Sequence, residues 1–196
     1  MAVKNVLKRG FKAKAERQAL EIRKSLGLSP WSPLCAFKVA EHIRIPVYDA
    51  TEFVNSSSSI NILSGHSGHD SEWSALTMWT KAGNRIIIYN PFHSQARQQS
   101  DVMHELAHII CEHEGDEPDE NLNLPFGLRK YHVEQEEEAN CLGSTLQLAK
   151  PCLFWAKKRN LPYEEIAKYF NASADMVKFR MNITGISKRR YINKKV

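Results

Sequence analysis

The chain has 196 residues, of which 42% are hydrophobic and 25% are charged, and these proportions are typical of a globular protein rather than a disordered one. No apolar segment approaches the ~20 residues that span a bilayer, and the basic N-terminus lacks the apolar core of a secretory signal. With four cysteines and no such signal, we expect a cytoplasmic protein with reduced thiols and no membrane segment. The net charge of +5 divides into +6 over residues 1–30, −10 over 31–149 and +9 over 150–196. The positive net charge of the whole chain is therefore no argument that the acidic segment 31–149 binds nucleic acid.

The first third of the chain predicts mostly helix. Apolar residues recur at helical spacing before a stop signal at Gly27, and a second, shorter apolar pattern follows a breaker-rich segment. We expect helices over 11–26 and 36–43, an extended segment over 45–48, and a loop rich in Ser, Gly and His over 55–71.

The clearest strand signal lies in the middle of the chain. Two apolar segments, 75–80 and 85–90, flank the short connector 81–84, whose glycine and asparagine tolerate positive φ. This pattern predicts an antiparallel hairpin.

Helical patterns dominate after the hairpin. Ser94 is a plausible N-cap for a helix running to about His113. Three further helices are expected over 133–149, 162–170 and 174–182, the last two after Pro151. Helices flanking a small antiparallel sheet predict an α+β fold.

A metal-binding motif lies in the helix after the hairpin. His104, Glu105 and His108 form an H-E-x-x-H sequence. On a helix the two imidazoles lie about 40° apart around the axis and can converge on one ion. The intervening glutamate projects about 100° away, where it can reach a water without ligating the metal. Apolar residues occupy the opposite side of this helix, which leaves the motif's side free to line a cleft.

A catalytic zinc site usually has three protein ligands, so a third must come from elsewhere. Cys111 lies one turn beyond His108, and we expect it to be a packing residue. The acidic helix 133–149 is a better source. Glu136 and Glu138 lie on opposite borders of its apolar stripe, and periodicity alone does not choose between them.

Several segments together resemble the ImmA/IrrE family of metallo-endopeptidases. HELAH is followed, 28 residues after its second histidine, by Glu136-x-x-x-Asn140 in EEEANCLG. The resemblance extends upstream through SALTMWTKAGNRIIIYNPFHSQARQQSDVMHELAH, and reaches AERQALEIRKSLGLSPWSP near the N-terminus and RMNITG near the C-terminus. It implies a zincin-like metallopeptidase domain over 1–196, with a basic helical segment over 1–30 and a helix-turn-helix-like pair with a basic tail over about 160–196.

The resemblance also implies roles for individual residues. His104, His108 and Glu136 would be the metal ligands, Glu105 the general base, and Asn140 a residue that orients a metal-binding histidine. Two histidines and a glutamate suit Zn²⁺ best, and Mn²⁺ also accepts such ligands. A donor should stabilise the tetrahedral oxyanion, and the candidates nearest in sequence are Tyr131, His132 and His113.

Members of the resembled family cleave, or are paired with, helix-turn-helix repressors. The resemblance therefore implies an Xre-type repressor as the protein substrate, whose cleavage relieves repression on a mobile element, in a prophage or in a stress regulon. The acidic central region would favour the approach of such a basic DNA-binding protein.

Two other functions remain open from the sequence. One is a proteolytically silent, metal-binding regulator or toxin-like partner of a repressor. The other is a DNA-binding module built on the C-terminal helices, in which five basic residues could contact phosphates: Lys178, Arg180, Lys188, Arg189 and Arg190. Against DNA binding, the second of these helices carries few base-reading side chains, and we expect Met176, Val177 and Phe179 to pack inward.

Overall fold

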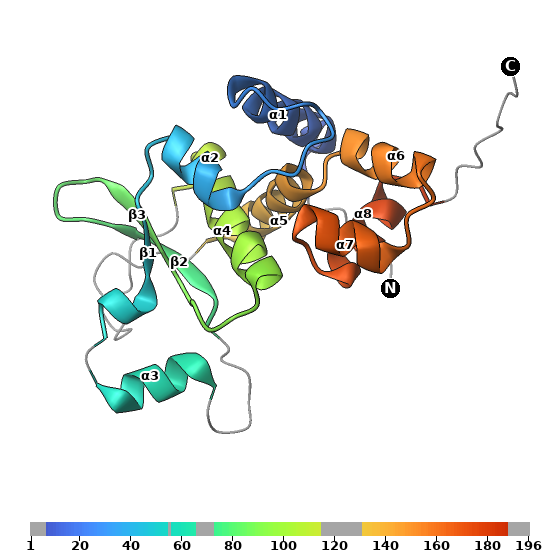
Figure 1. The fold of residues 1–196 in the computed structure, drawn as a ribbon. Coiled ribbons are helices and arrows are strands. Elements are labelled where there is room, and N and C mark those ends of the chain that lie inside the picture. Colours follow the sequence, from blue (N-terminus) through green and yellow to red (C-terminus); the bar gives the residue numbers. More distant parts are fainter. Residues whose placement is uncertain (1–6, 55, 66–72, 115–130, 188–196) are drawn as a thin grey trace, which may run out of the picture.

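Two helices, α4 (Gln95–Ile110) and α5 (Val133–Gln147), pack against each other at the centre of the fold (Figure 1). The computed structural model describes residues 7–54, 56–65, 73–114 and 131–187. The predicted N-cap of α4 is confirmed, because the Ser94 side chain accepts a hydrogen bond from the backbone N–H of Arg97. The buried face of α4 contributes Val102, Met103 and Leu106 to the core, as the apolar pattern predicts.

The described residues form a three-stranded sheet on one side of α4 (Figure 1). Its strands are β1 (Val47–Asp49), β2 (Ala75–Trp79) and β3 (Arg85–Tyr89), in the order β1-β3-β2. The predicted antiparallel hairpin is confirmed as β2–β3. The prediction of an entirely antiparallel sheet is wrong, because β1 joins β3 in parallel. The fold is nevertheless α+β, and among the strands that the structure describes β2 lies at an edge of the sheet.

The loop predicted over 55–71 contains a helix. Ser57–Ser64 form α3, although the serine-rich composition predicts irregular structure there. Residues 55 and 66–71 of that prediction lie outside the described part of the chain. Within the described residues, no helix is both long enough and apolar enough to cross a membrane.

The N-terminal helices match their predicted ranges and cover the central pair. α1 (Phe11–Ser25) packs on α5, and α2 (Ala36–His42) packs on α4. Arg23 of α1 is fully buried, and its guanidinium donates to the backbone oxygens of Ala19, Ser32 and Leu146, the last over 2.8 Å. These carbonyls satisfy a charged group that would otherwise be costly to bury.

Three helices close the other end of the molecule: α6 (Lys150–Lys158), α7 (Tyr163–Phe170) and α8 (Ala174–Ile183). The last two confirm the predicted helical pair. α6 was not predicted, since Pro151 suggested an interruption there. Proline is instead compatible with the first turn of a helix, where its missing N–H has no partner to lose, and this is the place it occupies in α6.

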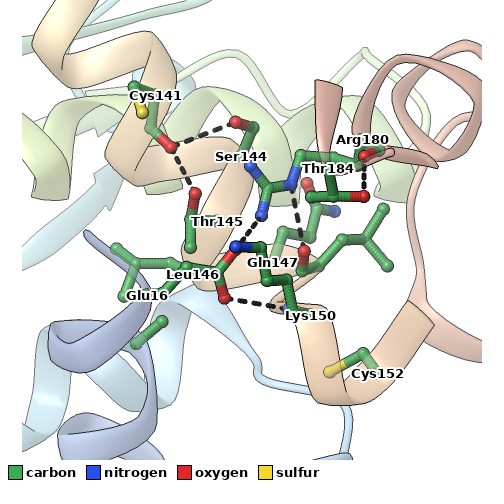
Figure 2. Close-up of polar contacts among 12 residues, drawn as sticks. Glu16, Cys141, Ser144, Thr145, Leu146, Gln147, Lys150, Cys152, Arg180 and Thr184 are labelled. Carbon is green, nitrogen blue, oxygen red and sulfur yellow. Dashed lines mark hydrogen bonds and ion pairs between the residues drawn. The ribbon is translucent and has the colours of Figure 1, made fainter. Parts of the chain in front are cut away.

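A buried ion pair fixes α8 to the N-terminal helix (Figure 2). Arg180 donates to Glu16 Oε1 over 2.8 Å and to the backbone oxygen of Leu148 over 3.0 Å. The second carboxylate oxygen of Glu16 accepts from the backbone N–H of Lys150, at the start of α6. A single glutamate of α1 thus holds both α6 and α8 in place.

Two expectations about α8 are wrong. Arg180 is 2% exposed, so its guanidinium is not on the surface to contact phosphates. Phe179 was expected to pack inward and is instead exposed, whereas Val177 is buried as expected. Lys178 is exposed, and residues 188–190 lie outside the described part of the chain.

Candidate metal centre

The two central helices approach closely beside the H-E-x-x-H motif. A Cβ added to Gly143 of α5 would lie 3.1 Å from the backbone oxygen of Met103 and 3.2 Å from the Cα of His104. Both distances are shorter than ordinary van der Waals contact, so only glycine fits there without a shift. Two turns before Gly143, the same helix presents Glu136 to the motif.

Glu136 completes a cluster of three donor side chains. His104 and His108 place their Nε2 atoms 3.1 Å apart. The carboxylate of Glu136 lies 3.2 Å from the Nε2 of His104 and 3.7 Å from the Nε2 of His108. Among the described residues, these three form the group of His, Cys, Asp and Glu side chains able to hold one ion.

The spacing of these atoms fits a tetrahedral ion. Ligand atoms about 2.0–2.1 Å from a tetrahedral zinc lie about 3.3 Å from one another. The three observed separations, 3.1, 3.2 and 3.7 Å, lie close to that value. Two imidazoles and a carboxylate also match the donor set of catalytic zinc sites, which leave the fourth position open. The side chains present therefore fit a zinc ion.

His108 is held in the form that binds metals. Its side chain is 1% exposed, and the ring of Tyr131 stacks on it with centroids 3.7 Å apart. Burial, reinforced by the neighbouring His104 and His113, lowers the pKa of His108 to about 3. The imidazole is therefore neutral at pH 7, which leaves a nitrogen lone pair for an ion.

Glu105 lies in the same turn but faces the sheet. Its carboxylate is buried and accepts a 2.6 Å hydrogen bond from the Thr77 hydroxyl on β2. Burial raises the pKa of Glu105 above its ordinary value, and hydrogen bonding from Thr77 opposes that rise. Thr77 was not singled out from the sequence. One signal was available, namely a polar side chain at the centre of a strand pattern.

A hollow of about 350 Å³ opens beside the cluster. One wall is the start of β2 and the residues before it, Trp73, Ser74 and Ala75. The other wall is α4, with Asp101, His104 and Glu105. An extended chain lying in this hollow would run along the edge strand of the sheet.

His113 lies behind the cluster rather than in the hollow. One ring nitrogen contacts His108 over 3.0 Å, and the other contacts Glu138 of α5 over 3.2 Å. Both ring nitrogens are engaged and the side chain is buried, and these contacts give no support to a role with an oxyanion. That role of His113 stays a prediction.

Asn140 is exposed on α5, and its predicted role of orienting a metal-binding histidine stays a prediction. From outside the donor cluster, His113 contacts His108. The two border glutamates, between which periodicity could not choose, both point toward this region. Glu136 reaches His104 and His108, whereas Glu138 reaches His113.

The remaining candidates lie around the start of α5. His132 is exposed at the N-cap of α5, where its backbone N–H donates to Gln135. The ring of Tyr131 lies against His108, and a role for either residue with an oxyanion stays a prediction. Cys111 stands apart from the donor cluster, and burial raises the pKa of its thiol to about 11, which disfavours the thiolate that binds metals.

Comparison with known proteins identifies one family. The family model described as the IrrE N-terminal-like domain, Peptidase_M78, matches residues 60–182. This range includes the whole donor cluster, Thr77 and His113, and it excludes α1 and α2. No individual curated protein matches the chain.

Proposed function

Because the chain belongs to the Peptidase_M78 family of IrrE N-terminal-like domains, we propose that it is a zinc-dependent endopeptidase that cleaves a helix-turn-helix repressor. The observation that carries the catalytic part is the cluster of His104, His108 and Glu136, spaced for one tetrahedral ion beside the buried carboxylate of Glu105.

His104, His108 and Glu136 would hold the ion, and the carboxylate of Glu105 would transfer the proton. Zinc bound there supplies a Lewis acid that acidifies water and polarises a peptide carbonyl. Glu105 takes the proton from the attacking water and passes it to the leaving amine. The raised pKa of Glu105 favours the first of these transfers, since a more basic carboxylate accepts a proton more readily than an ordinary one.

Thr77 keeps that carboxylate in place. Its hydroxyl is the donor to Glu105 Oε2, and it reaches α4 from the strand that borders the hollow. The bond removes one orientation that the carboxylate could otherwise adopt, so Thr77 is a positioning residue.

We expect Thr77→Val to lower kcat by about 10–100-fold, the equivalent of losing one hydrogen bond to a charged group. Steady-state kinetics should show KM and zinc affinity unchanged, because the Thr77 hydroxyl bonds to Glu105 and its loss leaves the three ligand side chains in place. Thr77→Ser keeps the hydroxyl and should recover most of the rate. Equal kcat values for the valine and serine variants would remove this role.

The substrate would bind as an extended segment along β2. Among the described strands, β2 has a partner on one side only, so its outer backbone groups can pair with another chain. The hollow at the start of β2 lies beside His104 and Glu105, where the scissile bond must be placed.

Charge supports a basic protein as the substrate. Residues 31–149, which supply the whole donor cluster, carry a net charge of −10. Glu134 and Glu137 are exposed at the start of α5, beside the ligand Glu136. A DNA-binding repressor presents a basic surface, and the family resemblance points to repressors of the Xre type.

We expect a helix-turn-helix repressor encoded near this protein to be cleaved when the two are mixed with Zn²⁺. Gel analysis at two salt concentrations should show slower cleavage at about 300 mM than at about 50 mM salt, because exposed charges are screened over a shorter distance. An acidic, unfolded protein such as casein is the matched control and should be a poorer substrate. A repressor left intact while casein is cleaved would contradict the proposed substrate but not the peptidase activity.

A further inference from the structure

The contact between two histidines behind the cluster has a definite direction. His108 offers its Nε2 to the donor cluster and its Nδ1 to the Nδ1 of His113. A hydrogen bond between two ring nitrogens needs one proton shared between them. If the Nε2 of His108 keeps a lone pair for an ion, its proton is on Nδ1, and His113 must accept it.

The proton of His113 is then fixed as well. With its Nδ1 acting as acceptor, a neutral His113 carries its proton on Nε2. That nitrogen lies 3.2 Å from the carboxylate of Glu138, which can only accept when ionised. Each contact therefore has one donor and one acceptor, in an order that runs from His108 through His113 to Glu138.

The backbone is shaped to put His113 there. Glu112 follows α4 with φ at 58°, a left-handed conformation that glycine usually occupies. The N–H of His113 donates back to the carbonyl oxygen of His108, and that of Glu112 to Ile109. This is a Schellman ending, and it folds His113 onto the helix turn that carries His108. A glutamate in this conformation is costly, and the contacts of the His113 side chain offset that cost.

Glu138, the last residue in this series of contacts, comes from α5. Glu138 is two residues after Glu136, and its carboxylate is 13% exposed. α5 therefore supplies both a direct ligand and the acceptor for His113. Neither His113 nor Glu138 touches the hollow, so neither is placed to contact a substrate.

We propose that Glu138 and His113 form a positioning relay that fixes the tautomer and ring orientation of His108 and thereby strengthens metal binding. This inference rests on the proposed function, because it takes His108 to be a metal ligand. A carboxylate behind a ligand histidine makes that ligand more basic, and loss of such a partner typically weakens metal affinity about 10–100-fold. Here a second imidazole lies between the carboxylate and the ligand.

The test measures Zn²⁺ affinity by competition with a chromophoric chelator, so it needs no substrate. We expect His113→Phe to weaken zinc binding by about 10–100-fold, because His108 loses its acceptor. His113→Gln offers a carbonyl oxygen to the same proton and should recover part of the affinity. Glu138→Leu should weaken binding more than Glu138→Gln does. His42→Phe, which replaces an exposed histidine on α2, should have no effect.

A second measurement uses the wild-type protein, so its result does not depend on whether a variant folds. Nitrogen-15 NMR of the zinc-loaded protein should show the proton of His108 on Nδ1 and that of His113 on Nε2. A proton on Nδ1 of His113, or equal zinc affinity in wild type and His113→Phe, would overturn the relay while leaving the peptidase proposal intact. A wild-type protein that binds no zinc would instead overturn the proposed function itself.

Discussion

Glu105→Gln is expected to lower kcat by about 10²–10⁴-fold, the range contributed by a well-placed general acid–base group. Glutamine has nearly the same shape and can still accept the hydrogen bond from Thr77, but it cannot take a proton from water. The three ligand side chains are unchanged, so zinc should stay bound. Kinetics on a cleaved repressor, together with zinc content by atomic absorption, would measure both effects.

The matched control is Glu165→Gln, which removes one negative charge from an exposed position on α7. It should leave kcat within about twofold, because surface substitutions away from the site have small effects. If Glu105→Gln cleaves as fast as wild type, Glu105 is not the general base. If neither wild type nor Glu105→Gln cleaves the repressor although both bind zinc and the repressor, a silent, metal-binding regulator becomes the better description.

The second large effect is expected far from the metal. Arg180→Met should lower the free energy of unfolding by about 3–5 kcal/mol, the usual cost of removing one partner of a buried ion pair. The substitution leaves the Glu16 carboxylate, only 15% exposed, without its cation, and it leaves the carbonyl oxygen of Leu148 without its donor. Urea denaturation followed by circular dichroism would measure the change.

Lys178→Met on the same helix is the control, since it removes an equal charge from an exposed position and should change stability by less than about 0.5 kcal/mol. Adding Glu16→Gln to Arg180→Met should recover part of the loss, because the carboxylate left unpaired is then neutral. A loss below about 1 kcal/mol for Arg180→Met alone would show that the ion pair is not what holds α8 in place.

The main elements of the fold were predictable because their signals are local. Ser94 caps α4, the connector 81–84 joins β2 to β3, and the spacing of apolar residues marks α1 and α5. The parallel pairing of β1 was not predictable in this way. It depends on which strand lies beside β1 after the chain has passed through α3 and the hairpin, and no local pattern records that.

The geometry of the site was likewise predictable only where it follows from local helix spacing. The H-E-x-x-H spacing alone predicts that His104 and His108 face the same way, and the structure places them so. The role of His113 depends on the left-handed conformation of Glu112, and a glutamate gives no sign of that conformation in sequence. Periodicity likewise placed Glu136 and Glu138 on opposite borders of one stripe, but which residue each would meet depended on the packing of α5 against α4.

The buried Arg23 has a consequence for the order in which the chain can fold during synthesis. Its guanidinium donates to the carbonyl oxygen of Leu146, which is 123 residues later in the chain. At a translation rate of about 5–20 residues per second, roughly 6–25 s pass between the two. Throughout that interval the helix end that accepts the charged side chain of Arg23 has not yet been made. The docking of α1 against α5 therefore comes after the synthesis of α5.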